Sequence, residues 1–427
     1  MQTFAAEQKL RTMKRFLSLL AMASLMAAFV ACDDDDDNSP DKALDNTVVK
    51  GVIEENQTWT ADKIYELDGR VVVNDGVSLT IEPGTIIKGR QGQGVSAAAL
   101  MIARGGKLNA VGTADTPIIF TTVLDNIKIG ESEGTNLSET DRGKWGGLVI
   151  LGKAPISPKT GTETQIEGVP ASESLGLYGG DVAADNSGKI QFVSIRHGGT
   201  SIAEGSEING LTLGGVGSGT TISDIEIFAN EDDGIEFFGG SVNVSNILVS
   251  YQGDDGVDID QAYSGTIDGF RIIHGGDTDK GLEIDGPEGA TNAAGKFTLK
   301  NGSVIGSGNK GNLGDFKSGA QGALENIVFS GYDAGQRLMF ASKYDAACAN
   351  TGDAYRNLKD GNLVFTKVEY NGFTVDVYDA AKTDAPCVVA ADDENAASLI
   401  DAGEAATGGP AGATWNWTVS AAKALVN

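Results

Sequence analysis

The sequence of 427 residues contains little cysteine, histidine and proline, and few positive charges. Its 3 cysteines exclude a scaffold held by many disulfides and a metal centre built from several cysteines. Its 9 prolines exclude collagen and a proline-rich disordered chain. The 32 Lys and Arg residues face 59 Asp and Glu residues, and the net charge of −27 argues against binding nucleic acid or anionic lipid through a basic surface. Hydrophobic residues make up 41%, which is enough for a folded core.

The N-terminus has the features of an export signal. An apolar run at residues 16–30 follows two basic residues and is too short for a stable membrane span, which predicts a signal peptide over residues 1–31. The alanine before Cys32 and the aspartates after it resemble the lipobox and the surface-export signal of lipoproteins from the Bacteroidota. This resemblance implies lipidation of Cys32, an Asp-rich tether over residues 32–45 and a lipid-anchored location in the outer membrane, facing the cell surface. A solvated spacer is the alternative for the aspartates.

Short β-forming segments separated by Gly, Asn and Asp follow from residue 48 onward, and in the middle of the chain they repeat. One series reads Ile-x-Asp/Asn-Ile-x-Ile or a close variant, at residues 222–227, 244–249, 267–272 and 324–329. A second series reads Asp-Gly-Ile-Glu-Phe or a close variant, at residues 233–237, 255–259 and 280–284. Neighbouring repeats lie 22–25 residues apart in the central part, a period typical of a β-solenoid and shorter than a propeller blade.

We therefore predict an all-β chain that forms a right-handed parallel β-helix (a solenoid) over residues 46–330. Its first segment acts as an N-terminal cap, and residues 331–427, which lack the repeat, form a C-terminal cap or small lobe. Strand alternation predicts which side chains face inward. The inward set is Ile235, Phe237, Val257, Ile259, Leu282 and Ile284, and the outward set is Glu236, Asp258 and Glu283.

Two features of the C-terminal region carry predictions of their own. Cys348 and Cys387 belong to a chain with an export signal, so we expect a disulfide between them. Residues 414–417, Thr-Trp-Asn-Trp, alternate like an edge strand and are expected to cover the last coil. Stacking of these tryptophans on sugars is the alternative.

Three longer motifs point to a group of proteins. They are Gly-Lys-Trp-Gly-Gly-Leu-Val-Ile-Leu-Gly at 143–152, Asp-Asp-Gly-Ile-Glu-Phe-Phe-Gly-Gly at 232–240 and Gly-Asp-Asp-Gly-Val-Asp-Ile-Asp at 253–260. These motifs resemble those of a widespread, largely uncharacterised group of β-helix lipoproteins and secreted proteins from the Bacteroidota. The resemblance covers about residues 50–330 and implies fold and location, but no activity.

Acidic residues recur at equivalent positions of successive coils and are expected to stack in one column. Carboxylates roughly 5 Å apart repel by about 1 kcal/mol per pair in water, so the column needs cations, raised pKa values or interleaved bases. Calcium is the expected metal because it prefers clustered oxygen atoms, and the candidate ligands are Asp233, Glu236, Asp255, Asp258, Asp279 and Glu283. The alternative is a solvated face whose aspartates cap turns, assisted by Lys280 and Arg271.

The two histidines, His197 and His274, each end a strand and precede Gly-Gly. Counting coils places Tyr251 beside His274, with Asp254 and Asp255 just beyond. Histidine with paired carboxylates suits general acid–base chemistry on a glycosidic bond, whereas a repeated turn residue is the alternative.

Asn-Glu-Asp at 230–232, Asp-Asp at 254–255 and His-Gly at 274–275 resemble, in their order, the motifs of polygalacturonase-type glycosidases, which are right-handed β-helices. The Arg-x-Lys that follows in those enzymes is missing, so the binding of an anionic uronate is left without its cations. An enzyme of this type would use Asp232, Asp254, Asp255, His274 and Tyr251.

The first functional prediction is non-enzymatic: a surface lipoprotein whose β-helix presents a rigid face to a glycan, a matrix or an outer-membrane partner, with calcium as a stabiliser. The second is a polysaccharide hydrolase or lyase. The third is an accessory subunit of an outer-membrane complex, which an exposed apolar patch would mark. The negative charge argues against nucleic acid as a partner in each case.

Overall fold

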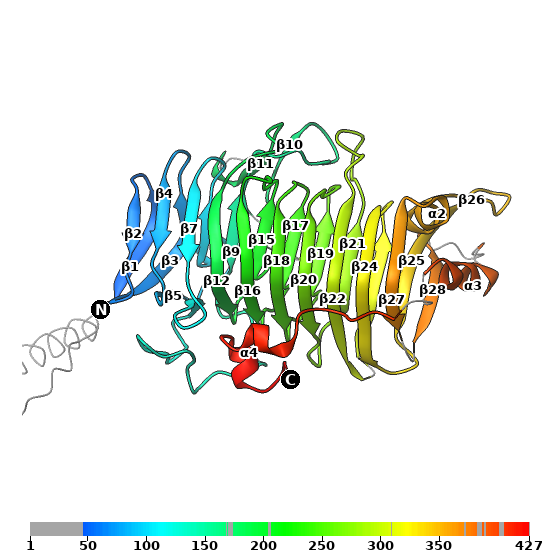
Figure 1. Ribbon diagram of the computed structural model, residues 1–427. Helices are drawn as coiled ribbons and strands as arrows, with labels where there is room; N and C mark the ends of the chain where they lie inside the picture. The colour runs from blue at the N-terminus through cyan, green and yellow to red at the C-terminus, as the bar shows by residue number, and fades with distance from the viewer. Residues whose placement is uncertain are drawn as a thin grey trace, which may run out of the picture. The chain divides into compact units, whose positions relative to one another are not determined.

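The computed structural model describes residues 46–426 except residues 168, 170–173, 204–205, 309, 371–372, 382–386, 388–389 and 401–404. The predicted signal peptide, the tether and Cys32 therefore lie outside the described residues. None of the helices in the described part of the chain combines the length and the hydrophobicity of a membrane span. Most of the described strands belong to one 24-stranded sheet that winds into a solenoid (Figure 1).

Parallel strands stack in two long ladders, one strand per coil. The first ladder contains β2 (Gln57–Trp59), β4 (Ser78–Ile81), β7 (Lys107–Val111), β12 (Gly188–Arg196), β16 (Thr221–Phe228), β18 (Asn243–Ser250), β20 (Thr266–Ile273), β22 (Phe297–Gly308), β24 (Gly322–Tyr332) and β27 (Leu363–Tyr370). The second contains β1 (Thr47–Ile53), β3 (Ile64–Val73), β6 (Ala99–Ile102), β9 (Leu148–Leu151), β15 (Leu211–Gly214), β17 (Ile235–Phe238), β19 (Val257–Asp260), β21 (Lys280–Asp285), β23 (Asn312–Lys317), β25 (Arg337–Tyr344) and β28 (Thr374–Asp379). β5 (Ile86–Gly89) and β8 (Ile118–Thr122) connect β3 to β12. The predicted all-β parallel β-helix is confirmed.

The repeated Asp or Asn of the first series has a conformational role. Asp224, Asn246 and Asn326 lie in the middle of β16, β18 and β24 with φ angles of 57°, 54° and 59°. Asp and Asn tolerate this left-handed conformation better than other residues with a Cβ atom. The side chain of Asn246 donates a hydrogen bond to Asp224 of the preceding coil at 3.1 Å. The repeat therefore marks the bend within each long strand.

The six side chains predicted to face inward are each at most 1% exposed. Their strands are in register, because Ile235 lies opposite Val257 and Val257 lies opposite Leu282. Stacking thus removes the apolar face of each coil from water, which a single coil could not do. The second series of the sequence repeat is the inner wall of the second ladder.

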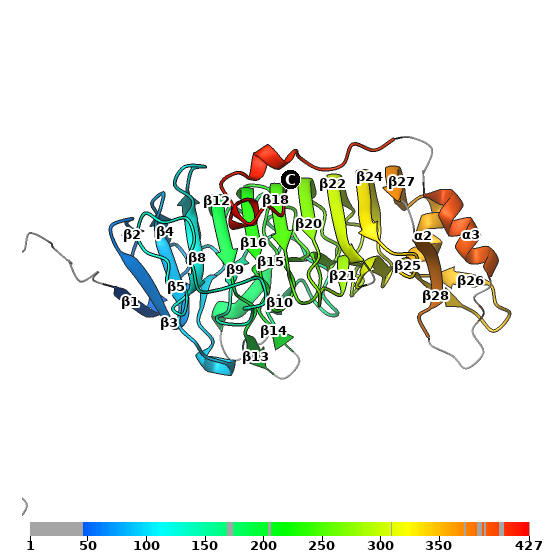
Figure 2. The same ribbon diagram turned by 90° about the horizontal axis from the view of Figure 1, so that it is seen from below.

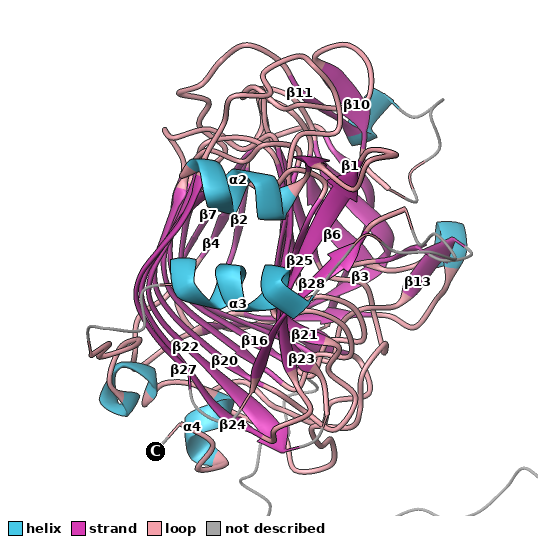
Figure 3. Cartoon of the chain, turned by 90° about the vertical axis from the view of Figure 1, so that its right-hand side faces the viewer, coloured by secondary structure: helices cyan, strands magenta, loops and turns pink. Residues whose placement is uncertain are grey.

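The solenoid continues beyond residue 330, where the sequence pattern had predicted the start of the cap. β24 pairs with β27, and β25 pairs with β28, both in parallel. An insertion with β26 (Asn350–Gly352) and α2 (Ala354–Asp360) interrupts the repeat there, which hides this coil from pattern analysis. α2 and α3 (Ala390–Leu399) lie across the C-terminal end (Figure 3), where Tyr355, Leu358 and Ala396 join the core.

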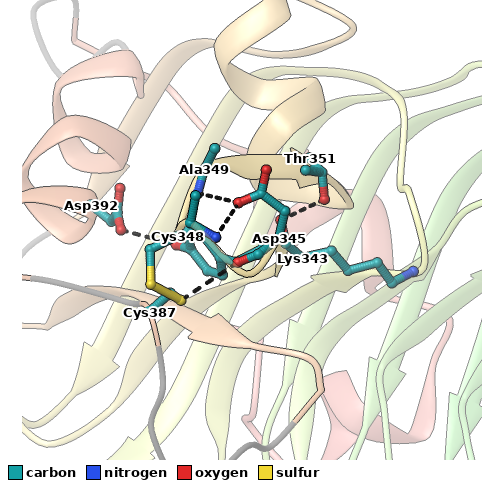
Figure 4. The surroundings of a disulfide bond; sticks show 9 residues. Lys343, Asp345, Cys348, Ala349, Thr351, Cys387 and Asp392 are labelled. Atoms are coloured by element: carbon teal, nitrogen blue, oxygen red, sulfur yellow. Dashed lines mark hydrogen bonds between the residues drawn. A yellow bond between two sulfur atoms is a disulfide. The ribbon is translucent and has the colours of Figure 1, made fainter.

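A disulfide joins Cys348 to Cys387, with 5.1 Å between their Cα atoms (Figure 4). Asp345 orders the neighbouring loop, because its carboxylate accepts hydrogen bonds from the backbone N–H groups of Ala347 and Ala349 at 2.9 Å each. The bridge ties the loop after β25 to the segment that leads into α3. It therefore links the capping helix covalently to the last coil.

Residues 405–426, which we call the C-terminal strap, run back along the outside of the solenoid (Figure 2). The strap contains η3 (Gly412–Trp415) and α4 (Val419–Ala422). Trp415 is 0% exposed and packs with Leu248 and Ile273, while the backbone N–H of Ser420 donates to Glu226 at 2.8 Å. The expected edge strand over the last coil is therefore wrong, because the buried indole anchors the strap to the middle coils. The same burial excludes Trp415 from stacking on sugars.

Candidate functional site

The acidic column lies on the outer side of the second ladder. Glu236, Asp258 and Glu283 are register partners on β17, β19 and β21, and Asp315 on β23 continues the column. The side chains point away from the core, yet Glu236 is only 8% exposed and Asp315 only 6%. Chain segments between β9 and β15 fold over this side of the ladder, including the antiparallel hairpin of β10 (Glu163–Gln165) and β11 (Leu177–Gly179) seen at the top of Figure 1. The outer face of the acidic column, whose exposure to solvent was the alternative prediction, is therefore partly covered by other segments of the chain.

Beneath these segments lies a cavity of about 240 Å³, which we call the acidic pocket. Seven carboxylates of the described part of the chain line it: Glu167, Asp232, Asp233, Glu236, Asp254, Asp258 and Glu283. Another part of its lining is apolar and is formed by Ala99, Met101, Val149, Ile166, Val169, Ile208 and Phe238. Arg70 is the single basic residue among the described residues of the lining. The pocket thus joins a strongly negative part to a hydrophobic part.

Four of the predicted metal ligands line this pocket, and three of them come close to one another. Asp233, Glu236 and Asp258 each offer a carboxylate oxygen within 4.8 Å of the others, and Asp233 also forms an outer group with Asp232 and Asp254. Burial, reinforced by neighbouring carboxylates, raises the pKa of Asp233, Glu236 and Asp258 well above the ordinary values. At neutral pH these groups therefore need protons or a cation to offset their charge.

Two buried oxygen atoms of the pocket have no hydrogen-bond donor among the described residues. Asn209 is 4% exposed, and its amide N–H group donates to Glu236 and, at 3.3 Å, to the hydroxyl of Thr212. This orientation leaves its Oδ1 without a partner, and Oδ1 of Asp258 is in the same state. Both oxygen atoms are closed off from solvent, and an unmet buried acceptor of this kind is costly to the fold.

The remaining predicted metal ligands already have a cation. The ammonium of Lys280 lies 3.4 Å from Asp255, 2.5 Å from Asp279 and 3.6 Å from Glu283, and Lys317 also pairs with Glu283. Although burial opposes it, the hydrogen bond with Asp255 and the two ammonium groups lower the pKa of Glu283 to about 2. Lys280 thus supplies a positive charge to these three carboxylates, while oxygen atoms of Asp255 and Asp279 also lie within 4.8 Å of one of Asp254. The predicted set of six divides into an open group and a lysine-filled group.

The candidate acid–base residues do not assemble. Asp232 and Asp254 line the acidic pocket, whereas Asp255 is 0% exposed. Neither His274 nor Tyr251 belongs to the described lining of the pocket. His274 Nε2 lies 3.0 Å from the hydroxyl of Tyr332, and burial lowers the pKa of His274 to about 4. The backbone N–H of Tyr251 donates a hydrogen bond to the carbonyl oxygen of Ile273 at 2.9 Å. Tyr251 and His274 therefore lie on adjacent coils, as the coil count predicts.

His197 is the second histidine, and its surroundings are equally closed. Its Nδ1 lies 2.6 Å from the carbonyl oxygen of Asp141, and its ring packs edge-on against Phe228. Burial lowers the pKa of His197 below its ordinary value. Both histidines therefore fit the repeated turn role better than the catalytic one.

Sequence reasoning missed Asn209, Arg70, Glu167 and the apolar residues of the pocket. One pattern could have revealed Asn209: Asn-Gly-Leu-Thr-Leu at 209–213 aligns with Asp-Gly-Ile-Glu-Phe at 233–237, and β15 pairs with β17 in that register. Asn209 is therefore the equivalent of Asp233 one coil earlier. Met101 and Val149 are also related to the column by the coil period, because they are register partners of Thr212 and, through it, of Glu236 on the second ladder. Ile166, Glu167 and Val169 come from the segment that joins β10 to β11, which no periodicity relates to the pocket.

The comparisons with known proteins agree with the fold. No curated protein and no solved structure matches the sequence. A family model described as a pectate-lyase-like β-helix domain matches residues 51–420, which includes all but the first residues of the two ladders, the acidic pocket and most of the C-terminal strap. The chain therefore belongs to the family of pectate-lyase-like β-helix domains.

Proposed function

We propose that the chain is a non-enzymatic lipoprotein of the outer membrane, facing the cell surface, whose β-helix binds a glycan in the acidic pocket. One observation carries this proposal: carboxylates and an apolar wall surround the same cavity. A concave site with an apolar lining and several polar groups is the usual form of a ligand site. Sugar rings offer both an apolar C–H face and hydrogen-bond donors.

The separation of the acid–base candidates favours binding over catalysis. Hydrolysis of a glycosidic bond needs an acid and a base on either side of one sugar ring. The buried imidazole of His274 is held by Tyr332, and Asp255 is held by Lys280, so neither reaches a ligand in the pocket. The positions of these two residues therefore favour binding of a glycan without cleavage of its glycosidic bonds.

The surface location rests on the sequence of residues 1–45, with lipid on Cys32 as the link to the outer membrane. A disulfide between Cys348 and Cys387 suits an oxidising compartment and supports export. A matrix component or an outer-membrane protein is the alternative to a glycan as the partner. Exposed large hydrophobic side chains are scattered between β1 and α3 in the described part of the chain, so the pocket is the better-supported contact site.

Calcium is the metal that would suit the pocket. Asp233, Glu236 and Asp258 would hold it through carboxylate oxygens that lie within 4.8 Å of one another, and oxygen atoms are the ligands that calcium prefers. Bound calcium would neutralise the carboxylates and stabilise the fold, by an amount that grows with the logarithm of the calcium concentration once it exceeds the Kd. A melting midpoint that responds neither to a chelator nor to added calcium would exclude this role.

The test of the proposed function uses the purified chain and a panel of neutral, basic and acidic polysaccharides. Retention of each polysaccharide and new reducing or unsaturated ends are scored in the same wells. We expect retention without new ends, and loss of retention in Asp258→Asn. The matched control is Asp315→Asn, which changes a buried carboxylate of the same column outside the pocket. No retention of any polysaccharide contradicts the proposal.

A polysaccharide-degrading activity is the second candidate. Family membership among pectate-lyase-like domains favours it, and a carboxyl with a raised pKa, such as that of Glu236 or Asp258, can donate a proton near neutral pH. New chain ends that appear with the wild type and vanish with Asp258→Asn would establish it. The same result would overturn the non-enzymatic proposal.

A further inference from the structure

The two ends of the solenoid differ in how their last strands are covered. At the C-terminal end, α2 and α3 lie across the final coil (Figure 3), and the carboxylate of Asp393 on α3 accepts a hydrogen bond from the backbone N–H of Val377 on β28 at 2.8 Å. Ile400, which follows α3, forms a parallel bridge with Phe365 of β27. The final strands of both ladders are therefore covered by later segments of the same chain.

The N-terminal end lacks such a cover within the described part of the chain. β1 pairs in parallel with β3 on one side, and no other described strand pairs with it. The free edge of such a strand presents unpaired N–H and C=O groups, which can add a strand from another chain. Val48 on β1 is 44% exposed and Val52 is 41% exposed, and they are two of the seven large hydrophobic side chains exposed among the described residues. The first coil therefore offers both backbone groups and apolar surface to a partner.

The charges on β1 indicate which partner fits this edge. The strand bends at Gly51, where φ is 71° and the register with β3 shifts, so its second half is the short segment 51–53. An exposed Lys50 precedes this segment and an exposed Glu54 follows it. If two copies pair antiparallel about a twofold axis at Val52, Lys50 of each copy lies beside Glu54 of the other. Parallel pairing would instead place like charges together, which is unfavourable.

We propose that the first coil is a dimerisation surface, at which β1 pairs antiparallel with β1 of a second copy of this chain. The inference goes beyond the proposed glycan-binding function and needs no ligand in the acidic pocket. Because the C-terminal end is covered, head-to-tail stacking into a filament has no second open edge to use. The contact is therefore made by the same surface on both copies and closes after two of them.

The length of chain before β1 also favours a second copy as the partner. With the proposed lipid on Cys32, the extended chain between Cys32 and Thr47 spans at most about 50 Å. Both copies of a dimer joined at their first coils can therefore be anchored in one membrane. Confinement to the same surface raises the effective concentration of one β1 edge near the other.

The test measures the mass of the purified chain by sedimentation equilibrium over a wide range of protein concentrations at physiological salt. We expect a reversible dimer. Lys50→Glu and Glu54→Lys should each weaken it at least about tenfold, because each places like charges together at both ends of the pairing. A mixture of these two variants should form a heterodimer as tight as the wild-type dimer, since opposite charges then meet again. The control is Lys189→Glu, which changes the net charge equally at an exposed position on β12 and should leave the dimer intact.

A second measurement tests the register. The twofold axis places Val52 opposite its own copy, so Val52→Cys should form a covalent dimer on mild oxidation. Val48→Cys should not, because the two copies of Val48 lie on opposite sides of the axis, and the oxidised wild type is the blank.

Three results would overturn the inference. The first is a wild-type chain that stays monomeric at every concentration. The second is a dimer that Lys50→Glu and Glu54→Lys leave unchanged, or that Lys189→Glu weakens equally. The third is a mixture of the two charge variants that forms no heterodimer, although each variant alone is folded by circular dichroism. Each of these results leaves glycan binding in the acidic pocket untouched.

Discussion

Replacing Asp258 by Asn should stabilise the chelator-treated protein, and the gain should grow with pH. In the folded protein, burial and then Glu236 and Asp233 raise the pKa of Asp258 well above its ordinary value. An acid whose pKa is higher in the folded than in the unfolded state costs no stability below about pH 4. Above that pH it costs about 1.4 kcal/mol for each pH unit, until the folded pKa is reached. Asn has the same shape without the charge, so the variant escapes this cost.

Asp260→Asn tests the same effect at a second buried carboxyl, whose pKa sets the pH at which the gain in stability should stop. Burial, followed by Asp285 and Glu288, raises the pKa of Asp260 to about 8, and Asp260 does not belong to the lining of the acidic pocket given above. Its gain should build up between about pH 4 and pH 8, reach on the order of 5 kcal/mol at most, and then level off. Urea unfolding of the wild type and both variants at pH 5, 6, 7 and 8 measures the gains. A gain that is constant with pH, or a loss at every pH, would refute this reasoning.

Three further substitutions test the core packing of the β-helix, the anchoring of the C-terminal strap and the disulfide. Phe237→Ala should lower the free energy of unfolding by about 3–5 kcal/mol in urea, because the ring is fully buried between coils; a loss below about 1 kcal/mol would contradict that packing. Glu226→Ala should cost about 3–5 kcal/mol and release the C-terminal strap to limited proteolysis, because the carboxylate accepts from Ser420 and lies beside buried Arg196; an unchanged digestion pattern would speak against the strap's anchoring. Replacing Cys348 and Cys387 by Ser should cost about 3–4 kcal/mol in urea, as expected for a bridge across 39 residues, and equal unfolding midpoints would show that the bridge is not needed.

The repeat allowed the fold and the acidic column to be predicted from the sequence. Ile235, Val257 and Leu282 occupy the same place in a repeated motif, so their stacking, and that of Glu236, Asp258 and Glu283 beside them, follows from the period. The alternation of strands also gives the outward direction of the acidic side chains. Local pattern and long-range register coincide here because each coil pairs with the next.

The covering of the column could not be predicted in the same way. The β10–β11 hairpin and the segment before β15 lie outside the repeat, and they bury Glu236 and create the pocket. Lys280 was recognised as a possible helper, but its contacts with both Asp255 and Glu283 depend on side-chain placement across coils. The C-terminal strap reaches Glu226 across almost 200 residues of sequence, a contact that no local pattern encodes.

The most direct test of the central claim about the site, that the clustered carboxylates of the acidic pocket need a cation to offset their charge, is a calorimetric titration of calcium into the chelator-treated chain. Titrations in two buffers of different ionisation enthalpy also count the protons released. The account predicts one site, proton release on binding because the carboxyls of Asp233, Glu236 and Asp258 are partly protonated beforehand, loss of binding in Asp258→Asn and retention in Asp315→Asn. No binding by the wild type, or binding that Asp258→Asn leaves unchanged, would contradict it.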